Sequence, residues 1–234
     1  MHYLQKYAQH ALDIVFPLRC AGCQANGYIL CPVCKTTIRP LTPPLCWHCS
    51  HTLSVNGSCQ SCHQHFLQLS GLRALGPYQE PLRSYIHQLK YDGNTHLAQP
   101  LGQLLALAYR TYGMHADIIL PVPLHEQRQR ERGYNHAALL ARVCASLLGI
   151  TVREDVLLRR RATSAQVGLK VDERYQNVAT AFDCSHAAAT NILTARCILV
   201  IDDVCTTGAT LEACAAPLFA AGALSVWGLV LALT

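Results

Sequence analysis

The chain has 234 residues, of which 51% are hydrophobic and 14% are charged, so it can form one sizeable aliphatic core and a small additional module. No apolar run reaches the roughly 18 residues that a transmembrane helix needs, and we therefore expect no membrane span. The formal net charge is +5, but eight zinc-bound thiolates and two Zn²⁺ ions would lower it to about +1, so net charge alone does not indicate nucleic-acid binding.

Residues 1–17 predict an amphipathic helix. Apolar side chains recur at helical spacing from Leu4 to Phe16 with polar residues between them, unlike the continuous apolar core of a secretory signal. Thirteen cysteines in a chain without such a signal indicate metal binding in a reducing compartment rather than disulfides. We therefore expect a cytoplasmic protein.

Residues 18–66 contain four Cys-x-x-Cys pairs and predict a double zinc ribbon module, because each pair can supply two thiolate ligands to a tetrahedral zinc ion. We favour two Cys₄ sites in sequence. Their ligands would be Cys20, Cys23, Cys31 and Cys34 in the first site and Cys46, Cys49, Cys59 and Cys62 in the second. A cross-braced arrangement, in which the first pair joins the third and the second joins the fourth, stays open. The module could be a folding device or a contact surface.

Residues 67–234 predict an open, mostly parallel α/β sheet, because strand-like and helix-like segments alternate along them. The expected strands are 72–78, 117–122, 198–201 and 224–232. The expected helices are 81–91, 97–112, 135–148 and a helix after residue 210 that Pro217 interrupts. In such sheets, ligands bind in a crevice outside the carboxyl ends of the strands.

A basic segment follows the second of these strands. Between residues 128 and 161, eight arginines accompany three acidic residues. Guanidinium groups bind phosphate through paired hydrogen bonds, so a loop with Arg128, Arg132 and Gly133 is a candidate for the pyrophosphate side of a ligand site. Residues 160–182 are polar and weakly periodic, which predicts a flexible loop that closes over the ligand.

Residues 198–210 are the most informative stretch of the chain. Four apolar residues predict a buried parallel strand, Asp202 and Asp203 follow it, and a turn of small residues opens an alanine-rich helix. Backbone N–H groups from Thr206 to Thr210 can bind phosphate, whereas the two carboxylates suit sugar hydroxyls. The pattern therefore predicts a site for a ribose 5-phosphate.

This stretch resembles the signature of the type I phosphoribosyltransferases, an apolar strand followed by two acids and Thr-Thr-Gly-x-Thr. The resemblance implies that the acids hold the ribose hydroxyls of phosphoribosyl pyrophosphate, that the next loop holds its 5-phosphate, and that Mg²⁺ binds on the pyrophosphate side. The implied ligand-binding residues are Asp202, Asp203, Val204, Cys205, Thr206, Thr207, Gly208, Ala209 and Thr210, with Arg128, Arg132 and Gly133. In an active transferase, Asp202 and Asp203 would be the catalytic candidates.

Nearly the whole chain resembles the ComF-type competence proteins. Besides the zinc ribbons and the signature strand, the shared motifs are Leu89-Lys90-Tyr91-Asp92-Gly93, Pro121-Val122-Pro123-Leu124, Arg132-Gly133-Tyr134-Asn135 and the segment from Arg161 to Phe182. The resemblance implies a protein of natural transformation that handles incoming single-stranded DNA in the cytoplasm and binds phosphoribosyl pyrophosphate or a nucleotide. It also implies a helicase-like competence ATPase as a partner, since this sequence has no P-loop of its own.

Three functions stay open at this point. For a DNA-handling protein, the candidate contacts to the DNA backbone are Lys90, Arg128, Arg130, Arg132, Arg159, Arg160 and Arg161. The alternatives are an active phosphoribosyltransferase of nucleobase or nucleotide salvage and a zinc-ribbon scaffold with a vestigial pocket. Aromatic residues are few, so DNA binding is expected to be electrostatic and independent of base sequence. The sequence identifies no base-recognition element.

Overall fold

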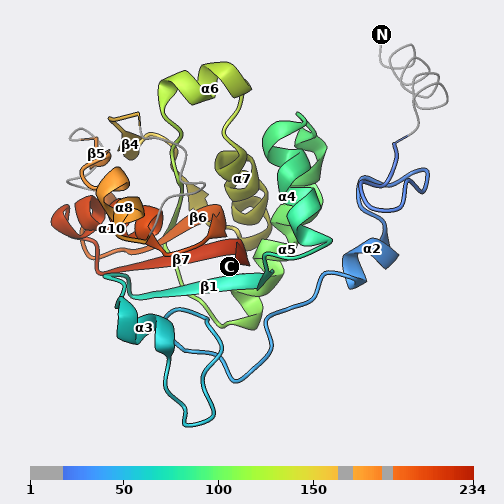
Figure 1. Cartoon of the computed structure of the whole chain (residues 1–234). Coiled ribbons are helices and arrows are strands. Elements are labelled where there is room, and N and C mark those ends of the chain that lie inside the picture. The colour runs from blue at the N-terminus through green and yellow to red at the C-terminus, as the bar shows by residue number, and fades with distance from the viewer. Residues whose placement is uncertain (1–17, 163–170, 186–191) are drawn as a thin grey trace.

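The computed structural model describes residues 18–162, 171–185 and 192–234 (Figure 1). The helix predicted for residues 1–17 lies outside these ranges. Five parallel strands form an open sheet with helices on both faces, and the cysteine-rich segment lies beside it (Figure 1). The α/β fold with an N-terminal cysteine-rich module, expected from the sequence, is thus confirmed. Within the described ranges, no helix has the length and hydrophobicity required to cross a bilayer.

The strand order in the sheet is β1-β7-β6-β2-β3, and every neighbouring pair is parallel. The strands are β1 Gly71–Pro77, β2 Ile118–Pro121, β3 Thr151–Val152, β6 Cys197–Cys205 and β7 Ser225–Leu233. The inner strands β6 and β7 are buried on both faces, which is why their sequences are nearly continuous apolar runs. β6 lies in the middle of the sheet, where its carboxyl end is flanked by β7 and β2.

β6 is longer than the strand predicted from the sequence. Its pairing with β7 continues from Asp202 through Cys205, so the two acids lie within the strand rather than after it. Successive side chains of a strand point to opposite faces of the sheet. Asp202 and Asp203 are therefore directed to different sides, which the sequence pattern did not reveal.

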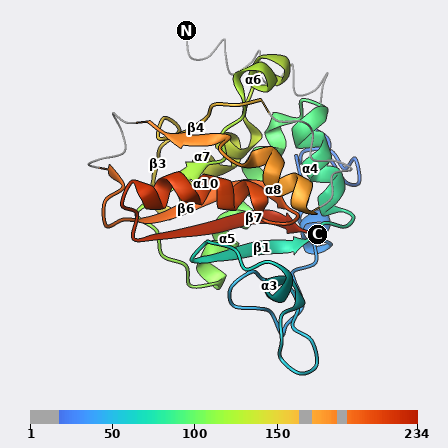
Figure 2. The ribbon, with the colours of Figure 1, turned by 60° about the vertical axis from the view of Figure 1, so that its left-hand side comes forward.

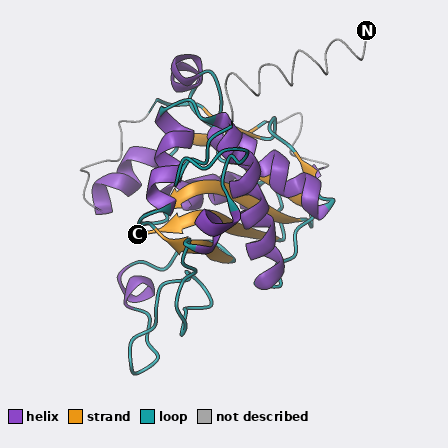
Figure 3. Ribbon diagram, turned by 90° about the vertical axis from the view of Figure 1, so that its right-hand side faces the viewer, coloured by secondary structure: helices purple, strands orange, loops and turns teal. Residues whose placement is uncertain are grey.

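Helices cover both faces of the sheet, with α4, α5 and α7 on one side and α8 and α10 on the other (Figures 2 and 3). The helices are α4 Leu82–Tyr91, α5 Ala98–Thr111, which follows the 3₁₀ turn η1 Thr95–Leu97, α7 His136–Leu148, α8 Val171–Val178 and α10 Ala209–Ala220. Alternate residues of β6 pack against each layer. Leu199 and Ile201 face the α4, α5 and α7 side, and Ile198 and Val200 face the α8 and α10 side.

α10 continues without a break through Pro217, where the sequence predicted an interruption. Proline lacks the N–H that would donate to the preceding turn, yet the helix continues to Ala220. Leu211, Ala215 and Leu218 are fully buried along its inner face. This packing against the sheet outweighs the single missing hydrogen bond.

The basic segment after β2 is a short helix rather than a loop. α6 spans Glu126–Arg132, begins with the His125 side chain accepting the N–H of Gln127, and ends at Gly133 with φ at +81°. None of the residues of α6 is buried. Figure 1 shows α6 projecting from the body of the molecule.

The segment predicted as a flexible loop, residues 160–182, is partly helical. β4 Leu157–Arg159 and β5 Phe182–Cys184 pair as an antiparallel ribbon, and α8 lies between them in the chain. Residues 163–170 lie outside the described ranges. Closure of this segment over a ligand stays a prediction.

The two halves of the cysteine-rich segment pack at different places. The first, with α2 Pro32–Thr36, packs beside α4, and the second, with α3 Gln60–Gln64, lies next to β1 (Figure 1). The backbone N–H of Leu72 in β1 donates to the carbonyl of His48, and the Ser50 hydroxyl donates to the Leu72 carbonyl. The second half thereby occupies hydrogen-bonding groups of the edge strand β1 that would otherwise be exposed.

Candidate functional site

Each group of four cysteines forms a candidate zinc centre. The Sγ atoms lie within 4.8 Å of one another in two groups, Cys20, Cys23, Cys31 and Cys34, and Cys46, Cys49, Cys59 and Cys62. Individual Sγ–Sγ distances are 3.6 Å for Cys23 and Cys31 and 3.7 Å for Cys46 and Cys62. Four Zn–S bonds of about 2.3 Å in a tetrahedron place the sulfurs about 3.8 Å apart. The geometry fits zinc and favours the sequential over the cross-braced arrangement.

Backbone donors around the first centre favour the thiolate form that binds zinc. The N–H of Cys31 donates to Cys20 Sγ at 3.3 Å, and the N–H of Cys34 donates to Cys31 Sγ at 3.4 Å. The cysteines outside the two groups differ in character. Burial raises the pKa of Cys144 to about 12, which is the behaviour of an inert core thiol.

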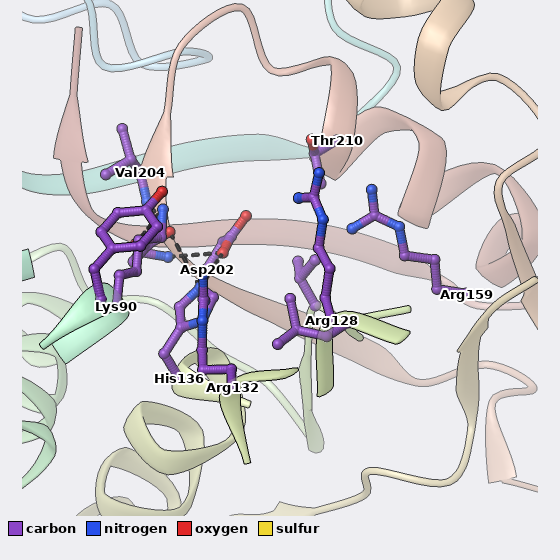
Figure 4. Close-up of a pocket in the computed structure, with 12 residues that line it drawn as sticks. Lys90, Arg128, Arg132, His136, Arg159, Asp202, Val204 and Thr210 are labelled. Carbon is purple, nitrogen blue, oxygen red and sulfur yellow. Dashed lines mark hydrogen bonds and ion pairs between the residues drawn. The ribbon is translucent and has the colours of Figure 1, made fainter. Parts of the chain in front are cut away.

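A cavity of about 160 Å³ lies at the carboxyl end of β6 (Figure 4). Its charged lining residues come from four elements. The basic ones are Lys90 of α4, Arg128 and Arg132 of α6, and Arg159 of β4, and the acidic ones are Asp202 and Asp203 of β6. Thr210, in the first turn of α10, and His136, the first residue of α7, complete the polar lining. The cavity therefore has an acidic wall and a basic wall, as a sugar phosphate requires.

Asp203 points toward the layer of α4 and α7 and is held there by several donors. The Lys90 ammonium lies 2.6 Å from Asp203 Oδ2, and the backbone N–H of Val204 donates to Asp203 Oδ1 at 2.8 Å. Its side chain is only 3% exposed. Burial opposes ionisation, but Lys90 outweighs it and holds the pKa of Asp203 well below its usual value. Asp203 is therefore a buried, permanently charged partner of Lys90.

His136 contributes a further donor toward the acids, and its tautomer follows from its neighbour. Arg132 Nη1 lies 2.7 Å from His136 Nδ1, and a guanidinium group can only donate, so Nδ1 accepts. The ring proton then sits on Nε2, which lies 3.6 Å from Asp203 Oδ1 and 4.0 Å from Asp202 Oδ1. Arg132 in turn lies over the ring of Tyr91, 5.2 Å from its centroid. In this arrangement His136 is a donor to the acids rather than a metal ligand.

Asp202 is the acid that faces the cavity. Its side chain is 14% exposed, and its Oδ1 accepts the backbone N–H of Asp203 at 2.9 Å. Figure 4 shows Asp202 directed toward the centre of the cavity, between Lys90 on one side and Arg128 on the other. Burial and the adjacent Asp203 carboxylate raise the pKa of Asp202 to about 8, and Lys90 offsets only part of this rise. The two acids thus have opposite electrostatic characters.

The raised pKa of Asp202 predicts a dependence of stability on pH. The folded state holds this proton up to about pH 8, whereas an unfolded aspartate releases it near pH 4. The contribution of Asp202 to stability is therefore fully present below about pH 4 and is lost as the pH rises to about 8. Asparagine has no proton to release, so Asp202→Asn does not lose this stability. The unfolding free energy of the variant minus that of the native protein should therefore increase with pH, by at most about 1.4 kcal/mol per pH unit.

Urea denaturation of both proteins between pH 5 and 9 measures this difference. Titrating groups that do not interact with Asp202, such as His51, whose pKa burial lowers, contribute equally to both curves and cancel. The difference should grow up to about pH 8 and then level off. A difference that is independent of pH would show that Asp202 is already ionised in the folded protein at pH 5.

The opposite wall of the cavity concentrates positive charge. Burial and the neighbouring Arg128 guanidinium lower the pKa of Arg159, so these two cations share one end of the cavity. Arg159 also packs over the ring of Phe182, 5.2 Å from its centroid. Thr210 lies beside them at the amino end of α10, where backbone N–H groups and the helix dipole favour an anion (Figure 4). A bound phosphate would relieve the repulsion between the two arginines.

The segment Arg132-Gly133-Tyr134-Asn135 mainly positions the elements around the cavity, and not all of its residues line it. Gly133 adopts the left-handed conformation that ends α6. The Tyr134 hydroxyl donates to the carbonyl of Leu89, next to Lys90. Asn135 Oδ1 accepts the N–H groups of Ala137 and Ala138 at the start of α7, and its Nδ2 donates to the Val122 carbonyl at 3.0 Å. These bonds fix α4, α7 and the end of β2 around the cavity.

The structure brings together only part of the residue set that the sequence suggested. The predicted residues in the cavity are Lys90, Arg128, Arg132, Arg159, Asp202, Asp203, Val204 and Thr210. Thr206 and Thr207 line a different cavity, Gly208 has φ at +86° as the N-cap of α10, and Cys205 and Ala209 are buried.

Three of the predicted DNA contacts lie outside the cavity. Arg130 is 3.8 Å from Glu126, Arg160 is 3.5 Å from Asp183, and Arg161 donates to the carbonyls of Asn177 and Ala179. Lys90, also a predicted DNA contact, has Asp203 as its partner. Sequence reasoning did not assign a role to His136. Its position directly after the helix cap Asn135, close to the basic segment, was the available signal.

Comparisons with known proteins agree with this organisation. A family model described as a double zinc ribbon domain matches residues 11–63. Competence protein F of Haemophilus influenzae is 33% identical over 226 residues, which cover 92% of this chain and 97% of that protein. The DNA utilization protein YhgH of Escherichia coli (strain K12) is 31% identical over 203 residues, which cover 84% of this chain and 87% of YhgH.

Solved structures that resemble this fold include a phosphoribosyl pyrophosphate enzyme. The glutamine phosphoribosylpyrophosphate amidotransferase from Bacillus subtilis, complexed with ADP and GMP, aligns with 58% of this chain and 26% of its own. The TM-score is 0.40 and the sequence identity is 19%. A likeness of this size does not bear on function.

Proposed function

Because the chain belongs to the ComF-type family of competence proteins, we propose that it handles single-stranded DNA in the cytoplasm during DNA uptake and binds phosphoribosyl pyrophosphate in the cavity at the end of β6. Relatives carry the names competence protein and DNA utilization protein. The choice of ligand rests on the cavity, in which Asp202 faces Arg128, Arg159 and the amino end of α10. Carboxylate on one side and cations on the other match a sugar diol joined to phosphate groups.

The contacts of the two acids indicate that they have different roles in binding the sugar. Asp203 is occupied by Lys90 and by the N–H of Val204, so its contribution is to fix charge and geometry. Asp202 is the acid exposed to the cavity, and it is the one that accepts hydrogen bonds from the sugar hydroxyls. This division differs from the sequence-based expectation that both acids hold the diol.

Mg²⁺ fits this site as a companion of the diphosphate rather than as a resident ion. Mg²⁺ prefers oxygen ligands and keeps several waters, with one or two carboxylates and substrate phosphates completing its shell. The Lys90 ammonium and the Nε2–H of His136 lie beside Asp203, so a cation is repelled there. Asp202 is the carboxylate that would share Mg²⁺ with the diphosphate, and the ion would neutralise charge on the phosphate oxygens.

The DNA strand is proposed to contact arginines outside the cavity. Arg130 on α6 is 79% exposed, and Arg160 after β4 is 61% exposed. Within the described part of the chain, each forms an ion pair with a solvent-exposed carboxylate, and such pairs contribute little to stability. Both guanidinium groups can therefore exchange that carboxylate for a DNA phosphate at low cost.

Salt dependence tests this assignment. For a single strand, each phosphate contact with the protein adds about 0.7 to the steepness of log affinity plotted against log salt concentration. The double variant Arg130→Gln with Arg160→Gln loses two such contacts, so its plot should be less steep by about 1.4. Fluorescence anisotropy with an oligonucleotide at several salt concentrations measures it. Arg110→Gln is the control, because Arg110 donates to the Leu147 carbonyl at the end of α7 remote from the cavity. An unchanged slope in the double variant would remove these arginines from the DNA interface.

If the same cavity is instead the site of an active transferase, a measurement of pyrophosphate release can show it. Transfer of the phosphoribosyl group to a base releases pyrophosphate, whereas binding alone does not. Pyrophosphate release that depends on one supplied base would replace a binding role with catalysis. A protein that binds neither DNA nor phosphoribosyl pyrophosphate would leave the zinc-ribbon scaffold as the function.

A further inference from the structure

A second cavity, of about 640 Å³, has no ligand under the proposed function. It is lined by Thr206 and Thr207 of the turn before α10, by Tyr175 of α8, and by the second cysteine-rich half around α3. Among the described residues, it shares no lining residue with the first cavity. The turn of residues 206–208 thus lies between two sites of different composition.

The lining of the second cavity suits an uncharged ligand that forms hydrogen bonds. Gln60 and Gln64, one turn apart on α3, and the hydroxyl-bearing residues Ser61 and Thr52 contribute to it. Among its described lining residues there is no lysine, arginine, aspartate or glutamate. A phosphate would have no cationic side chain to balance its charge, in contrast to the first cavity.

One wall of the cavity is a fixed pair of rings. The rings of His65 and Tyr175 lie 4.1 Å apart between centroids, at an interplanar angle of 38°. The Tyr175 hydroxyl donates to the Thr207 carbonyl at 2.7 Å, and His65 Nε2 lies 2.8 Å from Glu212 Oε2. Both rings are therefore held in place before any ligand arrives, which reduces the entropy lost on binding.

His51 completes the lining of the cavity beside Thr52. The cavity therefore offers amides, hydroxyls and a wall of two rings.

We propose that the second cavity binds a base of single-stranded DNA, and the choice of DNA rests on the proposed function. Glutamine amides pair with the donor and acceptor groups on the edges of bases, and side-chain rings stack on base faces. The base occupies the uncharged cavity while the sugar-phosphate backbone stays outside it. The strand is thereby held by base contacts next to the second zinc centre as well as by arginines.

Two single strands of equal length separate base binding from backbone binding. One is a dodecamer of thymidylate, and the other is a dodecamer with an abasic residue at every position. The native protein should bind the thymidylate strand about tenfold more tightly or better, in line with the effect of base stacking. The double variant Gln60→Ala with Gln64→Ala keeps the ring pair but removes both amides, so its preference for the thymidylate strand should be clearly smaller. Both glutamines are exposed, so the variant is expected to fold normally.

The control variant is Gln103→Ala, which removes an exposed glutamine of α5 and should keep the preference for the thymidylate strand. Equal binding of the two strands by the native protein, or a preserved preference in the double variant, would overturn the proposal. Calorimetry with Mg²⁺ and phosphoribosyl pyrophosphate on the same proteins separates the two sites. Unchanged affinity for phosphoribosyl pyrophosphate in the double variant is expected. Base preference without any binding of phosphoribosyl pyrophosphate would refute the first cavity's ligand and leave the second site standing.

Discussion

Replacing Lys90 with methionine is expected to lower the free energy of unfolding by about 3 kcal/mol, because it leaves the Asp203 carboxylate charged and unpaired in the interior. Lys90 is the cation 2.6 Å from Asp203, and the Asp203 side chain is 3% exposed. Methionine keeps most of the length and apolar surface of the lysine stem, so the decrease in unfolding free energy measures the effect of removing the ammonium charge. Urea denaturation at pH 7 measures it.

A second substitution separates the charge from other effects of Lys90→Met. Adding Asp203→Asn removes the unpaired carboxylate and should recover most of the lost stability. Asp203→Asn alone should be milder than Lys90→Met, because Asp202 is close enough to take over as the partner of Lys90. A cost below about 1 kcal/mol for Lys90→Met, which is the range of a surface pair, would contradict the buried ion pair.

Replacing Cys46 and Cys49 together with alanine is expected to remove one of two zinc ions and to unfold the second half of the cysteine-rich segment. Structural zinc in small domains provides about 10–16 kcal/mol of apparent binding free energy, which is folding free energy for the segment that it holds. Because this segment covers β1, the unpaired edge of the sheet should become exposed. Metal analysis and hydrogen exchange at residues 44–66 measure these two effects.

The matched control is Cys144→Ala, at a buried cysteine of α7 that belongs to neither group. It should retain two zinc ions per chain and lose only a small amount of packing. Two zinc ions remaining after the loss of Cys46 and Cys49 would contradict the assignment of these ligands. Fewer than two ions in the native protein would contradict the paired centres altogether.

The sequence predicted the features that are local and regular. The spacing of the cysteine pairs favoured the same two groups of four cysteines that the structure brings together, and apolar runs located β1, β2, β6 and β7 to within a few residues. Helical periodicity found α4, α5 and α7. These predictions succeeded because each depends on residues close together in the chain.

The features that the sequence missed depend on contacts between distant segments. The roles of Asp202 and Asp203 differ because β6 continues through them and the strand alternates faces. The tautomer of His136 follows from Arg132 and from the packing of α7 against β6. Packing against the sheet keeps α10 intact through Pro217, and the second cavity forms only where the zinc segment meets α8.

Titration calorimetry with Mg²⁺ and phosphoribosyl pyrophosphate tests the central claim, that Asp202 binds a sugar diol in the cavity at the end of β6. At pH 9, where Asp202 has released its proton, the native protein should bind, and Asp202→Asn should weaken binding about tenfold or more, since hydrogen bonds to a charged group contribute about 1.5–3 kcal/mol. Asp155→Asn, at an exposed acid paired with Arg153, should bind as the native protein does. Pyrophosphate without Mg²⁺, which offers Asp202 neither a sugar hydroxyl nor a metal ion, should bind the native protein and Asp202→Asn equally. Absence of binding by the native protein, or equal affinity for phosphoribosyl pyrophosphate in Asp202→Asn, would contradict the account.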